Sequence, residues 1–215
     1  METVTGYVTG INGNLANVSF DGAVHKNEVA YILVDGKRLK GEVIRINNGV
    51  ASMQIYEMSN GIKVGDQVEF TGELMSVELG PGLITSIYDG IQRPLKAMTA
   101  LSGVYVTEGS AIAALDEERE FDVTVTVKVG DKLHGGDIYA QCPETPLITH
   151  RCMVPPYTEG TVEYVAPDGK YKVNDVIVKL RIDEETVQEL TLVQKWPIRA
   201  PRPINKRLPI SKPLI

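Results

Sequence analysis

The sequence predicts a mainly β protein, and two observations support that prediction. Between residues 3 and 72, short β-branched runs alternate with Asn-Gly and Asp-Gly pairs. Such pairs favour type I′ hairpin turns, because both central residues of that turn need a positive φ angle. A second segment, residues 111–192, carries Gly- and Asp-containing turn markers of its own, so both parts of the chain are expected to be sheets.

The first segment has five clear strand candidates, and the spacing leaves room for a sixth. The candidates are residues 7–9, 16–20, 28–34, 41–46 and 50–56. Short strands at intervals of roughly 8–12 residues are typical of a small closed barrel. We therefore expect a β-barrel over residues 1–72, and no helix fits its pattern.

Three further segments complete the expected organisation. Residues 73–110 form a connector, in which a strand enters the Gly80-Pro81-Gly82 bend and a short helix can start near Pro94, since proline is tolerated in the first helical turn. Residues 111–192 form an inserted β domain. Residues 193–215 are basic and rich in proline, which excludes a helix and favours an extended strap.

Composition excludes several classes of protein. No apolar run approaches the roughly 20 residues that a membrane span requires. The first residues lack the basic and apolar regions of a secretory signal. A net charge of −6 argues against a protein that binds nucleic acid through its phosphates. Two cysteines, Cys142 and Cys152, are too few for a disulfide scaffold. We expect a soluble intracellular protein with free thiols.

The search for chemistry assigns no catalytic, cofactor-binding or metal-binding residue. The phosphate-binding pattern Gly-x-x-x-x-Gly-Lys-Ser/Thr is absent. Cys142, His150 and Cys152 lie within a short stretch but lack a Cys-x-x-Cys pair, so they are a poor match to a metal site. The acidic run 116–120 is interpreted as a solvated loop. The basic strap has one aromatic residue, Trp196, and lacks the stacking residues of a single-strand binder.

One pattern in the inserted domain is more specific. Residues 129–138 read Val-Gly-Asp-Lys-Leu-His-Gly-Gly-Asp-Ile, and residues 154–162 follow with Val-Pro-Pro-Tyr-Thr-Glu-Gly-Thr-Val. Together they resemble the barrel-sandwich hybrid fold of biotinyl and lipoyl carrier domains. A carrier needs a lysine on the hairpin between the two halves, and residues 141–151 contain none. The resemblance therefore implies the fold but not the carrier function.

The whole chain resembles the catalytic A subunit of V-type (archaeal and vacuolar) rotary ATPases. Four stretches carry the resemblance: residues 54–62, residues 74–83 with 88–95, residues 126–137, and the strap residues 190–203. The most specific stretch is the second, which contains Gly80-Pro81-Gly82-Leu83 and Tyr88-Asp89-Gly90-Ile91-Gln92-Arg93-Pro94-Leu95.

The resemblance implies an N-terminal, non-catalytic portion of such a subunit. The parent couples ATP hydrolysis or synthesis to H⁺ or Na⁺ transport and uses Mg-ATP. The expected partners are the B subunits of an alternating ring and the peripheral stalk, with neither nucleic acid nor membrane insertion. The expected location is cytoplasmic, at the membrane periphery. The family's catalytic residues have no counterpart here, so none is carried over. The alternative is a stand-alone β-barrel binding module without ATPase activity.

Overall fold

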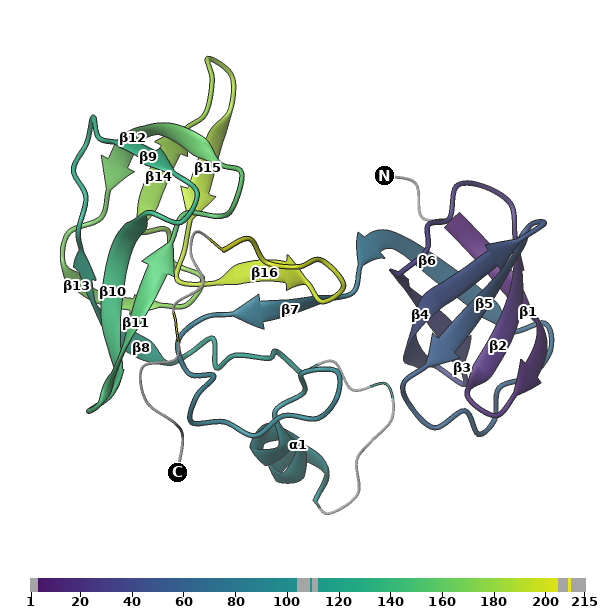
Figure 1. Cartoon of the computed structure of the whole chain (residues 1–215). Coiled ribbons are helices and arrows are strands. Elements are labelled where there is room, and N and C mark those ends of the chain that lie inside the picture. The colour runs from purple at the N-terminus through teal and green to yellow at the C-terminus, as the bar shows by residue number, and fades with distance from the viewer. Residues whose placement is uncertain (1–3, 104–108, 110–111, 205–208, 210–215) are drawn as a thin grey trace. The chain divides into compact units, whose positions relative to one another are not determined.

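The computed structural model describes residues 4–103, 109, 112–204 and 209, and it divides the chain into two compact units (Figure 1). Unit 1 contains residues 1–119 together with Val193–Arg199. Unit 2 contains Glu120–Leu192 and the chain after Arg199. Each unit is described separately below.

Unit 1 begins with a closed six-stranded antiparallel barrel in the order β1-β2-β5-β4-β3-β6. Its strands are β1 (Val4–Asn12), β2 (Leu15–Phe20), β3 (Glu28–Val34), β4 (Lys37–Asn47), β5 (Val50–Ile55) and β6 (Gln67–Leu74). Two-residue turns join β1 to β2, β3 to β4 and β4 to β5. They contain Gly13, Gly36 and Gly49, each at positive φ. In Asp35-Gly36 and Asn48-Gly49 both turn residues have positive φ, as predicted for a type I′ turn. The prediction is wrong at Asn12-Gly13, because Asn12 ends β1 and only Gly13 of the turn residues Gly13 and Asn14 has positive φ.

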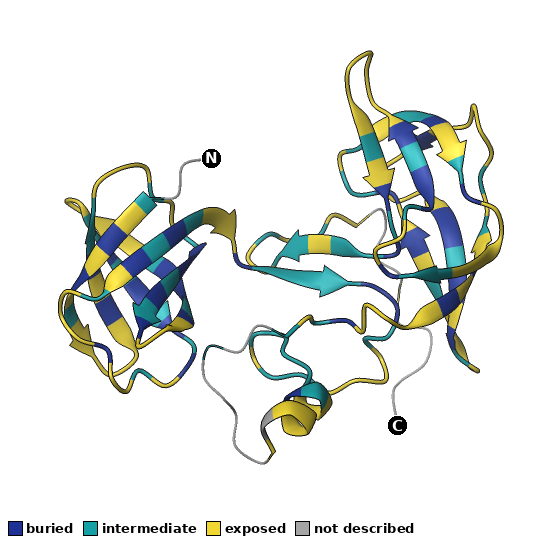
Figure 2. Cartoon of the chain, turned by 180° about the vertical axis from the view of Figure 1, so that it is seen from behind, coloured by how far each residue is buried: buried dark blue, intermediate teal, exposed yellow. Residues whose placement is uncertain are grey.

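Every second side chain along the barrel strands contributes to the barrel interior. Buried and more exposed residues alternate along the barrel strands (Figure 2). Val8, Val18, Ile32 and Met53 are fully buried, and their neighbours along the strands are more exposed. The rest of the core is built the same way: Ala16, Ala30, Val34, Leu39, Val43, Ala51, Ile55, Val68 and Phe70. Burial of these small and β-branched side chains is the main force that closes the barrel.

The connector follows the barrel with one strand and one helix. Strand β7 (Ser76–Leu79) pairs with β16 (Gln194–Pro197), so the strap returns to unit 1 as a two-stranded ribbon. Helix α1 (Leu95–Ser102) starts after Pro94, which is extended at φ −72° and ψ 115°. The helix ends at Gly103, whose φ of 72° suits glycine.

Unit 2 consists of two four-stranded antiparallel sheets. One has the order β11-β10-β8-β13 and the other β15-β14-β12-β9. The strands are β8 (Glu120–Val125), β9 (Lys132–His134), β10 (Ile138–Thr145), β11 (Ile148–Met153), β12 (Glu159–Val165), β13 (Gly169–Lys172), β14 (Val178–Arg181) and β15 (Val187–Leu190). Fully buried Tyr139, Val154, Ile177 and Leu180 belong to its core.

Aspartate side chains stabilise the turns of unit 2, including those of residues 129–138, the stretch that resembles the barrel-sandwich hybrid fold. The Asp131 carboxylate accepts the backbone N–H of Lys128 at 2.8 Å, and Asp137 accepts that of His134 at 2.8 Å. Asp175 accepts the N–H of Lys172 in the same way, at 2.7 Å. A side chain that binds the backbone three residues earlier stabilises a tight turn, so the aspartates in these motifs have a local structural role.

The mainly β fold class predicted from the sequence is confirmed: strands dominate both units, and helix α1 is the one α-helix among the described residues. The boundaries of the four-part division at 1–72, 73–110, 111–192 and 193–215 stay predictions. Most of the strap after residue 204 lies outside the described residues. Within the described part of the chain, no helix is both long and apolar enough to cross a membrane.

Gly41 on β4 provides a test of barrel packing. A Cβ built there would lie 2.4 Å from Met53 Cε and 2.6 Å from the carbonyl oxygen of Gln54. We expect Gly41→Ala to destabilise the chain by about 1–3 kcal/mol, because the backbone atom cannot yield as a flexible side chain would. Gly10→Ala is the control, since no atom lies within 4 Å of that Cβ. Urea unfolding measures both variants, and equal stabilities would contradict this account.

Candidate functional site

Two glutamates of the barrel, Glu42 on β4 and Glu57 just after β5, are buried carboxylates. A buried carboxylate is costly unless hydrogen bonds or a counter-charge compensate it. Each receives an arginine guanidinium from a segment that lies outside the barrel in the sequence. These contacts form the candidate site, which joins the barrel to the connector and the strap of unit 1.

Glu42 binds the strap. Arg199 donates its Nε to Oε1 at 2.8 Å and its Nη2 to Oε2 at 2.7 Å, across 157 residues of sequence. The hydroxyl of Tyr56 donates a further short hydrogen bond to Oε2. The Glu42 side chain is fully buried, so this two-pronged contact is the geometry that best compensates its charge.

These contacts control the ionisation of the cluster. The hydrogen bond from Arg199 lowers the pKa of Glu42, and it outweighs burial, which acts in the opposite direction. Burial, followed by the Glu42 carboxylate, raises the pKa of Tyr56. Glu42 is therefore ionised and Tyr56 neutral at physiological pH.

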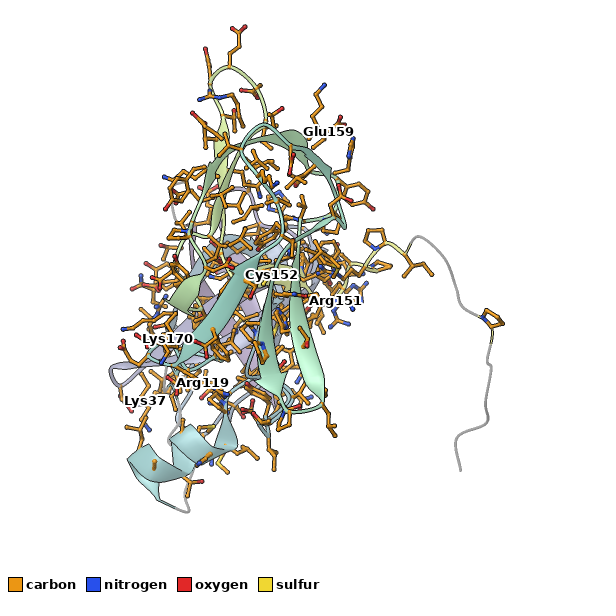
Figure 3. The ribbon with its side chains drawn as sticks, turned by 90° about the vertical axis from the view of Figure 1, so that its left-hand side faces the viewer. Lys37, Arg119, Arg151, Cys152, Glu159 and Lys170 are labelled. Carbon is orange, nitrogen blue, oxygen red and sulfur yellow. The ribbon has the colours of Figure 1, made fainter. Side chains whose placement is uncertain are left out.

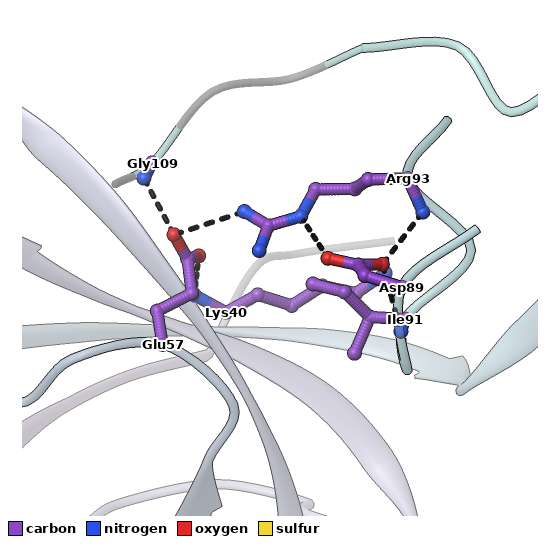
Figure 4. A network of polar contacts seen from close by, with 6 residues as sticks. All are labelled: Lys40, Glu57, Asp89, Ile91, Arg93 and Gly109. Atoms are coloured by element: carbon purple, nitrogen blue, oxygen red, sulfur yellow. Dashed lines mark hydrogen bonds and ion pairs between the residues drawn. The ribbon is translucent and has the colours of Figure 1, made fainter. Parts of the chain in front are cut away.

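Glu57 binds the connector (Figure 4). Its Oε2 accepts the backbone N–H of Gly109 at 2.6 Å and lies 3.3 Å from Nη1 of Arg93. Its Oε1 accepts the backbone N–H of Lys40 at 3.1 Å. Only 5% of the Glu57 side chain and 13% of the Arg93 side chain are exposed, so this pair is largely removed from water.

Asp89 holds Arg93 in place from the other side. Its carboxylate accepts the Nε–H and the backbone N–H of Arg93, both at 2.8 Å, and the backbone N–H of Ile91 at 3.1 Å. Burial alone would raise the pKa of Asp89, but these donors outweigh it and lower that pKa. Burial, then the nearby Arg93 guanidinium, lowers the pKa of Lys40.

A cleft of about 540 Å³ opens beside this network and is lined in part by Tyr31, Arg38, Lys40, Glu78, Gln92 and Arg93. Its charges largely bind protein partners. Arg93 bridges Glu57 and Asp89, Arg38 binds Glu69 at 2.8 Å, and the side-chain amide and carbonyl of Gln92 bind the backbone of Glu78. This arrangement is suited to holding segments together rather than to nucleophilic or acid–base chemistry.

The residues weighed for a metal site do not form one in the described part of the chain, where no three His, Cys, Asp or Glu side chains gather. Cys142 and Cys152 are buried free thiols on β10 and β11, and burial raises the pKa of Cys152 to about 12. Figure 3 labels Cys152 beside Arg151, which is exposed on the same strand. Nδ1 of His150 lies 3.9 Å from Oε2 of Glu144, and burial lowers the pKa of His150.

The other segments singled out in the sequence have local roles. Asp116 of the acidic run accepts the backbone N–H groups of Glu118 and Arg119, as expected of an exposed turn. Gly80-Pro81-Gly82 forms a bend in which Gly82 has a φ of 102°.

Sequence reasoning from residue chemistry did not find the network. The sequence stretches that carry the family resemblance nevertheless contain five residues of the network: Tyr56, Glu57, Asp89, Arg93 and Arg199. Glu42 lies outside those stretches. The Glu42–Arg199 and Glu57–Arg93 contacts join residues far apart in the chain, so no local spacing rule could reveal them.

Replacement of Arg93 tests the Glu57 network. Arg93→Ala leaves Glu57 and Asp89 largely buried without their cation, and we expect a loss of about 3 kcal/mol in the free energy of unfolding. Arg38→Ala is the control, because the Arg38–Glu69 pair is 56% and 30% exposed. An exposed pair contributes about 1 kcal/mol or less. Urea unfolding compares the two, and a smaller loss for Arg93→Ala than for Arg38→Ala would contradict this account.

Replacement of Arg199 tests the strap contact. Trp196, the single tryptophan, lies on β16 three residues before Arg199. We expect Arg199→Ala to shift its fluorescence to longer wavelength at pH 7, because β16 loses its anchor. Arg151→Ala, which replaces an exposed arginine of unit 2, should leave the emission unchanged. An emission spectrum of Arg199→Ala identical to that of the wild-type chain would show that Arg199 does not anchor the strap.

The pH dependence of the same variant has a defined sign. Since the folded-state pKa of Glu42 is lowered, its stabilisation is complete above the unfolded value of about 4.3 and disappears as the pH falls through the folded value. The difference in melting temperature between the wild-type chain and Arg199→Ala should therefore be largest near pH 7 and shrink below about pH 4. A difference that grows on acidification would exclude the ion pair as its source.

Comparison with known proteins identifies both β units. Residues 8–72 match the model of the ATP synthase alpha/beta family, beta-barrel domain. Residues 112–199 match the model of the ATP synthase alpha/beta subunit barrel-sandwich domain. The two matches correspond to the barrel of unit 1 and to a segment that includes all of β8–β16.

Among curated proteins, the chain is 42% identical over 215 residues to the V-type ATP synthase alpha chain 2 of Clostridium tetani, covering 100% of this chain and 36% of the relative. It is 46% identical over 177 residues to the A subunit of the A-type ATP synthase of Desulfurococcus sp., covering 82% of this chain and 30% of the relative. The chain thus spans about a third of the length of these relatives. It belongs to the ATP synthase alpha/beta family, as a homologue of the N-terminal region of V-type and A-type A subunits.

Proposed function

We propose that this chain acts as the N-terminal, non-catalytic portion of the A subunit of a V-type rotary ATPase. In that role the barrel of unit 1 joins a ring of alternating A and B subunits, and unit 2 contacts the peripheral stalk. The proposed location is the cytoplasm, at the periphery of the membrane. The family match over the whole chain supports this role.

The observation that carries the proposal is the double anchorage of unit 1. Glu42 holds Arg199 of the strap and Glu57 holds Arg93 of the connector, so segments far apart in the sequence are bound to one barrel. An assembly domain must transmit force between neighbouring parts of a complex without unfolding. Multiply hydrogen-bonded ion pairs with a buried carboxylate fit that requirement, because their separation leaves a buried charge without its partner.

Catalysis is assigned to the parent rather than to this chain. The parent would bind Mg-ATP and couple its hydrolysis or synthesis to H⁺ or Na⁺ transport. No Gly-x-x-x-x-Gly-Lys-Ser/Thr segment occurs in these 215 residues. No step of ATP chemistry is therefore assigned to the residues of this chain.

Association with a B subunit tests the proposal. The chain is co-expressed with the B subunit of the same complex, purified and analysed by native mass spectrometry and an ATPase assay. We expect a complex of the two polypeptides, and we expect no ATPase activity from the chain alone. If the chain stays free of B subunit, the assembly role is wrong and the stand-alone binding module replaces it. ATP hydrolysis by the purified chain would contradict the non-catalytic assignment.

A further inference from the structure

Lys40 on β4 is the fourth charged residue of the network around Glu57 (Figure 4). Its backbone N–H donates to Oε1 of Glu57, so the Lys40 side chain begins within the network. The Lys40 ammonium also interacts electrostatically with Arg93, Glu57 and Asp89. The network therefore contains two carboxylates, Glu57 and Asp89, and two cations, Arg93 and Lys40.

The two cations of the network are held differently. The Arg93 guanidinium contacts both carboxylates, at 3.3 Å from Glu57 and 2.8 Å from Asp89. In the part of the chain that the structure describes, the Lys40 ammonium forms no hydrogen bond and lies within 4 Å of no carboxylate. Lys40 therefore balances the charge of the network without being fixed by a direct partner.

The Lys40 side chain is reached from the cleft beside the network. Lys40 is half-buried and lines this cleft of about 540 Å³. It also lines a smaller cavity of about 210 Å³, which shares Tyr31, Ser76 and Glu78 with the cleft. Ligand sites in proteins have volumes of about 300–1,000 Å³. The cleft can therefore admit a small reagent to the Lys40 amine.

The surroundings of Lys40 favour its neutral, nucleophilic form. Burial lowers the pKa of Lys40, the Arg93 guanidinium lowers it further, and together they outweigh Glu57 and Asp89. Desolvation and a neighbouring cation are the features that activate a lysine as a nucleophile. Lys40 thus differs from the other two cations of the cleft, Arg38 and Arg93, which bind carboxylates.

The cleft also has groups that fit an acyl phosphate. Ile91, Ile112 and Ala113 give it an apolar wall for an acyl group. Arg38 binds Glu69 through Nη2, and the other N–H groups of its guanidinium can hold a phosphate. The described lining residues include three cations and two carboxylates, which favours an anionic reagent: Arg38, Lys40 and Arg93 against Glu57 and Glu78.

We propose that Lys40 is a site of acylation by acyl phosphates and that its acylation releases the connector from the barrel. The neutral amine attacks the carbonyl carbon, so a C–N bond forms while the bond from that carbon to the phosphate oxygen breaks. Inorganic phosphate leaves with the electron pair of the broken bond, and the amine loses its proton to solvent. This reaction modifies the chain without turnover, and the proposal does not depend on the assembly role.

Acylation changes the charge balance of the network. The amide on acylated Lys40 carries no charge, so Arg93 alone then faces Glu57 and Asp89. A buried carboxylate that lacks full compensation is unfavourable. Arg93 and Asp89 belong to the connector and Glu57 to the barrel, so the contact that weakens is the one between the connector and the barrel.

The reactivity of Lys40 is tested with acetyl phosphate. The full chain is treated with a limiting amount near pH 7, and peptide mass spectrometry measures the acetylation rate of each lysine. Lys63 is the reference, because it is an exposed lysine of the same unit that also lacks an ion pair in the described part of the chain. We expect Lys40 to react at least threefold faster than Lys63, although it is less exposed. A rate equal to or below that of Lys63 would overturn the proposal.

Hydrogen exchange measures the consequence for the connector. The backbone N–H groups of Ile91 and Arg93, which bind Asp89, should exchange at least fivefold faster in the acetylated chain, while those of β10 in unit 2 stay unchanged. Lys40→Arg treated in the same way is the matched control, because its other lysines react while position 40 keeps its charge. Lys40→Gln, which has no charge there, should exchange faster without the reagent.

Thermal unfolding verifies that both variants fold. If the acetylated chain exchanges at the rate of the untreated chain, the proposed release of the connector is wrong. An equal increase in treated Lys40→Arg would assign the effect to other lysines and would also overturn the proposal.

Discussion

The architecture of unit 1 depends on the need to compensate two buried carboxylates. Glu42 on β4 and Glu57 just after β5 are buried, and an unpaired charge at a buried position is strongly destabilising. Their counter-charges come from Arg199 and Arg93, which the barrel strands do not contain. These ion pairs therefore bind the connector and the strap to the barrel. The pairing of β7 with β16 also binds the strap to the connector.

Charge is divided unevenly around the barrel, and strands β1, β2 and β5 contain no Asp, Glu, Lys, Arg or His. Strands β3, β4 and β6 carry the charged residues, and β4 contributes directly to both anchors. Strands β1, β2 and β5 need no charge for the internal contacts of unit 1.

In unit 2, hydrogen bonds from backbone N–H groups to aspartate side chains stabilise the turns. Asp131, Asp137 and Asp175 each bind a backbone N–H three residues earlier and fix a turn. Tyr139 in the core donates to the carbonyl oxygen of Thr191, and burial raises the pKa of its hydroxyl. Cys142 and Cys152 are both buried. Burial raises the pKa of Cys152 to about 12 and so disfavours the thiolate that redox or metal chemistry requires. The turns of unit 2 are thus stabilised by short-range contacts, whereas its sheets and the Tyr139–Thr191 hydrogen bond join residues far apart in the chain.

The sequence by itself determined the β class, the hairpin turns and the family. Alternation of side chains and the Asn-Gly and Asp-Gly turns act within a few residues, so they can be recognised along the chain. Only the tertiary structure showed that Glu42 meets Arg199 and that Glu57 meets Arg93. It also showed that the three uncharged strands are neighbours, although β5 follows β4 in the chain. The two ion pairs and the strand order of the barrel bring together residues that are far apart in the sequence. These contacts follow from the folded geometry of the closed barrel, and no local sequence pattern predicts them.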